Sequence, residues 1–143
     1  MKRNMLVLGM VMALAGAMLA GCATGAGKGL TPEEEISLQM EKWREAMMAK
    51  DVDAIMVLFS DKFEHYDWRD KAGAKMFILE AIDMGYMDDM DVILDDAQIK
   101  VDGNVASVYP VDLVGNFGSL SMELIVSREN GEWLLTGMDA PGL

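Results

Sequence analysis

The chain has 143 residues and a formal net charge of -12 at pH 7, with 24 acidic residues against 12 basic ones. This length suits one domain of ordinary size. The acidic balance excludes a nucleic-acid binder, which needs a basic surface against the phosphates. The single Cys excludes an internal disulfide, and with only one His in the chain no spacing typical of a zinc site occurs.

The first 21 residues have the pattern of a secretory signal. Lys2 and Arg3 give it a positive start, and an uncharged run follows from Met5 to Ala20. This run is interrupted by glycine and is shorter than the roughly 20 apolar residues that a membrane-spanning helix needs. Residues 1–21 are therefore predicted to be a signal peptide that is removed from the mature protein.

The uncharged run ends in Leu-Ala-Gly-Cys at residues 19–22. This sequence resembles the lipobox of bacterial lipoproteins, which implies that Cys22 is acylated, becomes the new N-terminus and binds the lipid bilayer. The alternative is an ordinary secretory signal with a Cys near its cleavage site. Among such lipoproteins the residue after the Cys influences sorting, and Ala23 favours the periplasmic face of the outer membrane. In an organism with one membrane, the outer face of the cell membrane is expected instead.

A flexible tether is predicted between the anchor and the domain. Residues 22–30 hold three glycines and show no hydrophobic periodicity. The folded domain is expected to occupy residues 31–143. Since this domain is acidic, it offers no basic patch to an anionic membrane surface, and attachment is expected to depend on the lipid of Cys22.

The first half of the domain is predicted to be mainly helical. Thr31 can cap a helix with Pro32 at its first position and Glu34 completing a capping box, and apolar residues at helical spacing continue to about Lys50. Asp51 can cap a second, short helix, whose predicted buried residues are Val52, Ile55, Met56 and Phe59.

A strand and a third helix are predicted next. Lys62 to Asp67 is predicted to be a strand that places Phe63, His65 and Asp67 on one face. A helix is expected from Asp70 to Met84, with Gly85 as its C-cap. Its expected buried residues are Met76, Phe77, Leu79, Ala81 and Ile82.

After Gly85 the hydrophobic pattern changes from helical to alternating. Strands are predicted over residues 91–101, 105–114, 119–127 and 132–138, with hairpin turns at Asp102-Gly103 and Asn130-Gly131. Helices followed by an antiparallel meander predict an α+β roll, in which one curved sheet is covered by helices.

Three segments of the chain resemble the NTF2-like superfamily, the cone-shaped fold of SnoaL-like and ketosteroid-isomerase-like proteins. They are WREAMMAKDVD at residues 43–53, AIMVLFSDKFEHYD at 54–67 and SRENGEWLL at 127–135. The resemblance implies an α+β cone-shaped roll with a curved antiparallel sheet of about four to five strands and three N-terminal helices. It also implies a homodimer formed through the open face of the sheet.

Because the fold hosts many unrelated functions, the resemblance alone does not decide the activity. A cone with an aromatic and methionine lining but no complete catalytic set predicts a non-enzymatic binding or assembly module with an apolar pocket for a small ligand. No cofactor is expected. The predicted pocket-lining residues are Trp43, Met47, Phe59, Phe63, Tyr66, Tyr109 and Glu123.

An acid–base enzyme of isomerase or dehydratase type is the first alternative. By the resemblance, Asp67 falls where the isomerases have a carboxylate base, Trp43 where they have a donor Tyr, and Glu123 where they have a protonated Asp. His65 could assist Asp67. Two features depart from this pattern: Trp is the weaker donor, and strand parity points Glu123 outward.

A copper-binding lipoprotein is the second alternative. Met84, Met87 and Met90 lie close together in sequence, and thioethers select Cu(I), although Met also fills gaps in a core. Six aspartates between residues 83 and 96 lack the spacing of an EF-hand. They could hold a weakly bound Ca²⁺ or a basic partner, or they could form a solvated surface.

Overall fold

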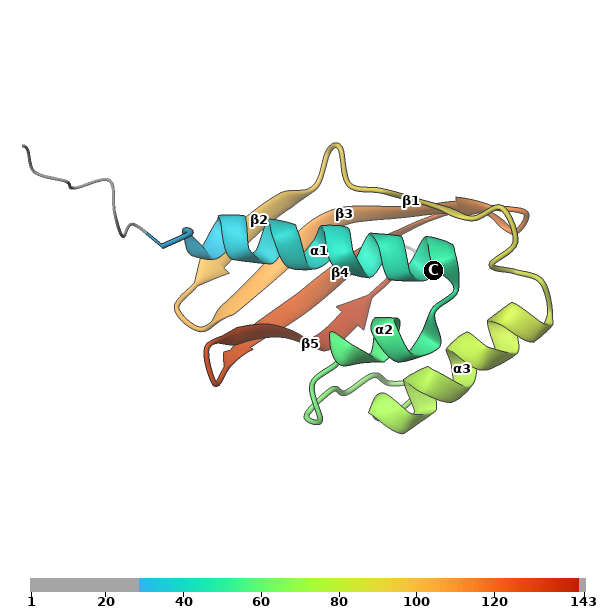
Figure 1. Cartoon of the computed structure of the whole chain (residues 1–143), viewed down its shortest axis with the longest axis horizontal. Helices are drawn as coiled ribbons and strands as arrows, with labels where there is room; N and C mark the ends of the chain where they lie inside the picture. Colours follow the sequence, from blue (N-terminus) through green and yellow to red (C-terminus); the bar gives the residue numbers. More distant parts are fainter. Residues whose placement is uncertain (1–28, 142–143) are drawn as a thin grey trace, which may run out of the picture.

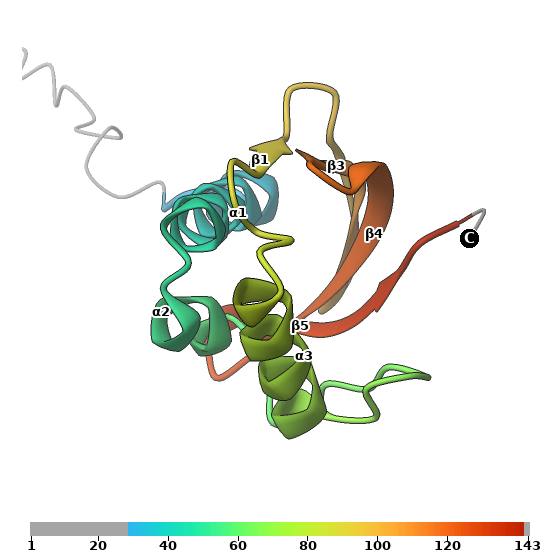
Figure 2. The ribbon, with the colours of Figure 1, turned by 90° about the vertical axis from the view of Figure 1, so that its right-hand side faces the viewer.

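Three helices lie over one face of a curved antiparallel sheet in the computed structural model, which describes residues 29–141 (Figure 1). Seen from the end of the domain, the sheet curves around the helices (Figure 2). The predicted α+β roll is therefore confirmed. The signal peptide, Cys22 and most of the tether lie outside the described residues. No helix among residues 29–141 is long and apolar enough to cross a membrane.

The helices begin where the sequence places their caps. In the capping box, the Thr31 hydroxyl accepts from the Glu34 N–H at 3.2 Å, and the Thr31 N–H donates to the Glu34 carboxylate at 2.8 Å. At the other two helices, the carboxylates of Asp51 and Asp70 each accept from one backbone N–H of the first turn. The helices are α1 (Pro32–Ala49), α2 (Val52–Val57) and α3 (Lys71–Asp83).

The sheet is a meander with an interrupted edge. Its strands are β1 (Asp91–Ile93), β2 (Gln98–Asp102), β3 (Val105–Gly115), β4 (Gly118–Glu129) and β5 (Glu132–Asp139). Both β1 and β2 pair with β3, followed by β4 and β5 in order. Both predicted hairpins are confirmed, with positive φ at Gly103 and at Asn130 and Gly131.

The prediction of one continuous edge strand over residues 91–101 is wrong, because the structure has two shorter strands there. β1 and β2 are separated by a turn, and the β3–β4 register shifts between Val108 and Val111. Pro110 lies within that shift, and it has no N–H to donate to a neighbouring strand. The edge of the sheet is therefore divided into two short strands, one on either side of Pro110.

The strand predicted over residues 62–67 is absent. This segment is a loop whose backbone makes single contacts: the Glu64 N–H donates to the Thr136 carbonyl at 3.1 Å, and His65 and Arg69 form one isolated bridge. Arg69 has a φ of 66°, which turns the chain back before α3. Alternation of Phe63 with polar residues predicted a strand, but the tight turn that follows leaves no partner to extend it.

The buried face of α3 also differs from the prediction. Ala74 and Ile78 face the core, whereas Met76 is 72% exposed, and Phe77 and Leu79 are half exposed. Apolar residues surround this helix on several sides, so their spacing does not define one buried stripe. By contrast, the predicted core faces of α1 and α2 are buried apart from Val52, which is only partly covered.

Candidate functional site

A cavity of about 250 Å³ lies between the helices and the inner face of the sheet. Its wall comes from the C-terminal half of α1, from α3, from the segment 84–90 and from β3, β4 and β5. Every described residue that lines it is aliphatic, aromatic or a methionine. The cavity therefore has the chemistry of a site for an apolar molecule.

The inner part of the cavity wall is buried and includes aromatic rings, and five methionines also line the cavity. Trp43, Met47 and Phe59 are buried there. Methionine side chains are unbranched and adapt to the shape of a neighbour. The wall methionines are Met47, Met87, Met90, Met122 and Met138.

Three aromatic residues mark the mouth of the cavity. Phe77, Tyr86 and Phe117 line it, and about half of each side chain is exposed to solvent. They come from three separate elements: α3, the segment that follows it, and the β3–β4 turn. Aromatic rings at the entrance of an apolar cavity suit the capture of a flat, hydrophobic ligand.

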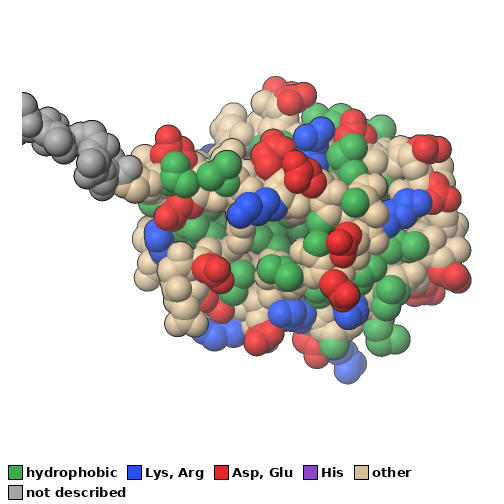
Figure 3. Space-filling view, viewed as in Figure 1, with side chains coloured by type: hydrophobic (Ala, Val, Ile, Leu, Met, Phe, Trp, Pro, Cys, Tyr) green, Lys and Arg blue, Asp and Glu red, His purple; other side chains and the backbone are tan. Residues whose placement is uncertain are grey.

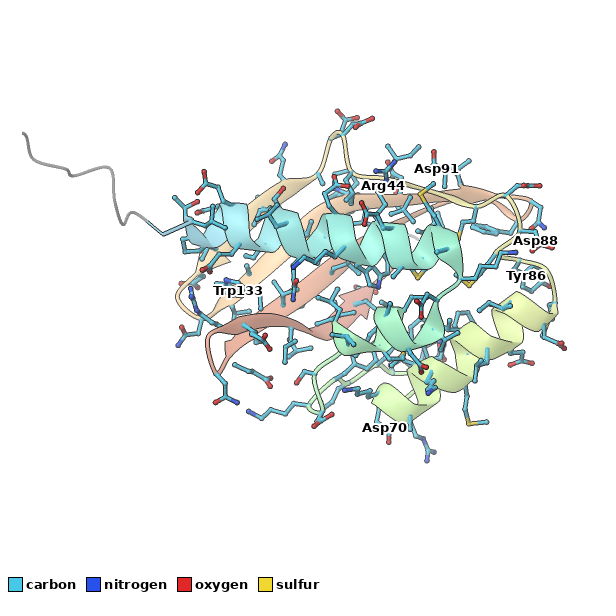
Figure 4. The ribbon with its side chains drawn as sticks, viewed as in Figure 1. Arg44, Asp70, Tyr86, Asp88, Asp91 and Trp133 are labelled. Atoms are coloured by element: carbon cyan, nitrogen blue, oxygen red, sulfur yellow. The ribbon has the colours of Figure 1, made fainter. Side chains whose placement is uncertain are left out.

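Two polar contacts hold the mouth together. The Asn116 side-chain amide in the β3–β4 turn donates to the Gly85 carbonyl at 2.8 Å, and Lys50 at the end of α1 pairs with Asp88. Figure 4 shows Asp88 and Tyr86 at the same end of the molecule, far from the start of α1. Gly85 has a φ of 76°, so it turns the chain sharply after α3 and brings Tyr86 to the cavity.

One residue of the cavity wall carries an unusual polar atom. The Nε1–H of Trp43 is buried without a hydrogen-bond partner, and it is the single side-chain nitrogen or oxygen in this state among the described residues. The Trp43 side chain is only 3% exposed. A buried indole N–H normally finds an acceptor.

Only some of the residues predicted to line a pocket lie in the wall of the cavity. Trp43, Met47 and Phe59 line the cavity. Phe63 is buried but lies behind the wall, where its ring packs edge-on against Phe59 at 4.8 Å between centroids. Tyr66 is 91% exposed, so the prediction that it lines a pocket is wrong.

His65 and Asp67 do not form the polar pair in the cavity that the acid–base alternative needs. Both lie in the loop before α3, and Asp67 is exposed. The Nδ1 atom of His65 accepts from the backbone N–H groups of Asp67 and Trp68 at 3.2 and 3.3 Å. The His65 ring stacks on Trp68 at 4.2 Å. His65 therefore holds this loop in shape, and no carboxylate base faces the cavity wall that the structure describes.

Tyr109 and Glu123 lie on the opposite face of the sheet. Met122 and Leu124 face the cavity side and are buried, which leaves Glu123 between them pointing outward, as strand parity predicts. Glu123 and Tyr109 line a separate hollow together with Lys100. Their predicted place in the inner pocket is therefore wrong.

The three methionines of the copper alternative occupy different environments. Met84 is 53% exposed at the end of α3, whereas Met87 and Met90 are buried in the cavity wall. Within residues 29–141, no three His, Cys, Asp or Glu side chains gather as metal ligands do.

Acidic and basic side chains are interspersed over the face that carries α1 (Figure 3).

Sequence reasoning missed most of the mouth. Phe77, Tyr86 and Phe117 line the cavity, and none of these three was predicted to do so. An aromatic residue next to a turn glycine was the available signal for two of them, since Tyr86 follows Gly85 and Phe117 precedes Gly118.

Comparison with solved structures agrees with this architecture. A protein of unknown function with a cystatin-like fold from Nostoc punctiforme has a TM-score of 0.61 at 17% identity, over 80% of this chain and 96% of that chain. An NTF2-like protein of unknown function from Pseudomonas putida has a TM-score of 0.60 at 16% identity, over 77% and 87%. A proposed dehydratase from the NTF2-like family of Streptomyces avermitilis has a TM-score of 0.58 at 16% identity, over 74% and 91%.

The chain therefore has the NTF2-like fold, as its sequence predicts. No protein-family model matches the sequence, and a search of curated proteins gives no match. At these identities the likeness concerns the fold, and activity has to be argued from the cavity itself.

Proposed function

We propose that this protein binds a small apolar molecule in the cavity between α1, α3 and the sheet, and that it does so without chemical conversion. The observation that carries this proposal is a cavity of about 250 Å³ whose described lining residues include no carboxylate, imidazole, thiol or amine. Binding needs only burial and shape, whereas acid–base catalysis needs a titratable group beside the substrate, and the one phenol of the described lining, Tyr86, is half exposed at the mouth.

The energy of such binding comes from the aromatic and methionine wall. A ligand that buries about 200 Å² of apolar surface gains about 5 kcal/mol at 25 cal/mol per Å², before the cost of association is subtracted. Stacking between a flat ligand and the mouth residues Phe77, Tyr86 and Phe117 adds to this gain. A dissociation constant of about 0.1 mM is therefore expected for a ligand of naphthalene size.

The acid–base alternative lacks its central group. Asp67 is exposed in the loop before α3, and Glu123 faces away from the cavity. Neither carboxylate can reach a ligand that sits between Trp43 and Met122. The proposed dehydratase among the similar structures shares the fold with this chain, and the positions of Asp67 and Glu123 favour binding over catalysis here.

Fluorescence titration with N-phenyl-1-naphthylamine tests the proposal, because this uncharged probe brightens in an apolar site. Ala81 lines the cavity from α3, and Ala81→Phe would fill it. Ala72 lies on the exposed side of the same helix, so Ala72→Phe is the matched control. We expect Ala81→Phe to weaken binding by more than about tenfold, because the added ring occupies the site, and Ala72→Phe to leave it unchanged.

Two outcomes would overturn the proposal. The wild-type protein could fail to bind uncharged apolar probes, or Ala81→Phe could bind as well as Ala72→Phe while both variants remain folded by circular dichroism. The second result would place the probe outside the cavity.

The proposal includes attachment of the domain to a membrane through acylated Cys22, on the periplasmic face of the outer membrane where two membranes exist. Its support is the lipobox-like sequence at residues 19–22. Cys22→Ser should release the protein from the membrane fraction and abolish labelling by palmitate. Unchanged membrane association of this variant would contradict the anchor.

The position of the cavity suits a protein held at its N-terminus. α1 spans about 27 Å at 1.5 Å per residue, its first residue Pro32 adjoins the tether, and the mouth lies near its other end (Figures 1 and 4). A domain tethered before Pro32 can therefore present its mouth away from the bilayer. A homodimer through the outer face of the sheet stays a prediction, and light scattering would test it.

A further inference from the structure

The unpartnered N–H of Trp43 remains unexplained by an apolar cavity. A buried donor without a partner costs roughly 1–3 kcal/mol, and the Trp43 Nε1 atom is the one side-chain case among the described residues. Phenylalanine would supply a similar ring without this cost. A tryptophan at this position is therefore best explained if its N–H donates a hydrogen bond to a bound molecule.

A second tryptophan shows how this protein treats an indole that has only a structural role. Trp133 is also 3% exposed, but its Nε1–H donates to the Glu35 carboxylate at 3.1 Å. The two side chains are equally buried, and only the one in the cavity wall lacks an acceptor. The tryptophan that lacks an acceptor is therefore the one that lines the proposed ligand site.

We infer that the ligand is an uncharged apolar molecule with one hydrogen-bond acceptor oxygen, such as a ketone, ester or ether, and that this oxygen accepts from Trp43 Nε1–H. The inference rests on the proposed function, since it assigns the chemistry of the molecule bound in the same cavity. The acceptor fixes the orientation of a ligand that the apolar wall would otherwise hold in several ways.

The charges around the cavity exclude an anionic ligand. No described lining residue is a Lys or Arg, and a buried carboxylate without a cation is strongly destabilised. At the mouth, Asp83, Asp88 and Asp89 flank Tyr86 in the chain, and the nearby Lys50 is already paired with Asp88. An anion would therefore meet repulsion on entry and find no counter-charge inside.

The methionines provide the access that the buried N–H requires. Trp43 lines the cavity, but its Nε1 atom is covered in the absence of ligand, and the same wall includes Met47 and Met122. Methionine has three rotatable side-chain bonds and moves at low cost. The proposed hydrogen bond therefore requires a side chain of this wall to move when the ligand enters, so that its oxygen can reach Nε1.

The test compares two probes that differ only in the acceptor: 6-propionyl-2-(dimethylamino)naphthalene and its 6-propyl analogue. Trp43→Phe keeps a ring in the wall but removes the donor. The matched control is Trp68→Phe, which removes another indole from the same cavity. For each protein, the ratio of the two dissociation constants reports the preference for the carbonyl, independent of general loss of packing.

We expect Trp43→Phe to reduce the carbonyl preference by about fivefold, which corresponds to a neutral hydrogen bond of about 1 kcal/mol. Bound propionyl probe should also emit at shorter wavelength in this variant, because its carbonyl loses a donor. Trp68→Phe should leave the ratio unchanged. A ratio that is the same in wild type and Trp43→Phe would overturn the inference while leaving the proposed function intact.

Failure of both probes to bind the wild-type protein would instead overturn the proposed function, and the inference with it. Anionic 8-anilino-1-naphthalenesulfonate differs from N-phenyl-1-naphthylamine by one sulfonate, and we expect it to bind more weakly by at least about tenfold. Equal binding of these two probes would contradict the exclusion of anions.

Discussion

Trp133, in β5 against the start of α1, and Trp43, in the second half of α1, are buried to the same extent, yet their surroundings differ. Trp133 packs beneath the start of α1, where its N–H donates to Glu35 and the Arg128 guanidinium lies 5.6 Å above its ring. Arg128 and Glu35 also form an ion pair at 3.0 Å. Trp43 has only apolar neighbours in the cavity wall, and its N–H has no acceptor.

This contrast divides the domain into a closed end and an open end. At the closed end, polar and apolar contacts are both complete, which is what stability requires. At the open end, a cavity and an unpartnered donor are retained at a cost in stability, as is common at functional sites. Substitutions at the two ends are therefore expected to have different effects on stability and on ligand binding.

The largest effect is expected from core truncation at Leu124, which faces the cavity side of β4 but is fully buried. Leu124→Ala should lower the free energy of unfolding by about 4 kcal/mol, because a new void is created. Met122→Ala, two residues away, only enlarges a cavity that exists, and about 1–2 kcal/mol is expected. Urea denaturation measures both, and equal losses would contradict the open cavity.

The second effect separates the two tryptophans directly. Trp133→Phe removes a hydrogen bond to a carboxylate, so a loss of about 2 kcal/mol in unfolding free energy is expected. Trp43→Phe removes the cost of an unpartnered donor but also loses packing because the ring is smaller. These effects oppose each other, so a net change of about 0.5 kcal/mol or less is expected. Thermal and urea denaturation check the pair. A larger loss for Trp43→Phe than for Trp133→Phe would mean that its N–H has a structural partner.

The third effect concerns the mouth. Asn116→Ala removes the hydrogen bond to the Gly85 carbonyl, so a destabilisation of about 1 kcal/mol and faster release of a bound probe are expected. Ser119→Ala in the adjoining strand, whose side chain is exposed, is the control. Stopped-flow dilution of the probe complex gives the release rates. Identical rates in both variants would show that this contact does not restrain the mouth.

The smallest effect is expected at the residue that the isomerase resemblance selected. Asp67→Asn alters an exposed side chain away from the cavity, so a change in stability within about 0.5 kcal/mol is expected. Probe affinity should stay the same. A marked loss of affinity would bring Asp67 back into the site and with it the acid–base alternative.

The fold was predictable because its signals are local. The capping box at Thr31, the cap at Asp51 and the turn at Asn130-Gly131 each involve neighbouring residues, and all three are present. The loop around His65 was not predictable, because its shape depends on a bridge to Arg69 and on stacking with Trp68. Alternation in so short a segment is compatible with either a strand or a loop.

The site was predictable only in part for a similar reason. Trp43, Met47 and Phe59 lie on helices or beside them, where the apolar stripe determines direction. The mouth is assembled from α3, the segment around Tyr86 and the turn at Phe117, which are distant in sequence. Their meeting depends on the sheet register and on Gly85, and no local pattern reports it.

The central claim is that Trp43 donates to a ligand in the cavity while Trp133 keeps its structural partner. The chain has three tryptophans, so a two-dimensional ¹H–¹⁵N spectrum resolves three indole N–H signals, which single Trp→Phe variants assign. On addition of 6-propionyl-2-(dimethylamino)naphthalene, the Trp43 signal should move downfield as a hydrogen bond forms, and the Trp133 signal should stay in place. Saturation of binding with no movement of the Trp43 signal would contradict the claim.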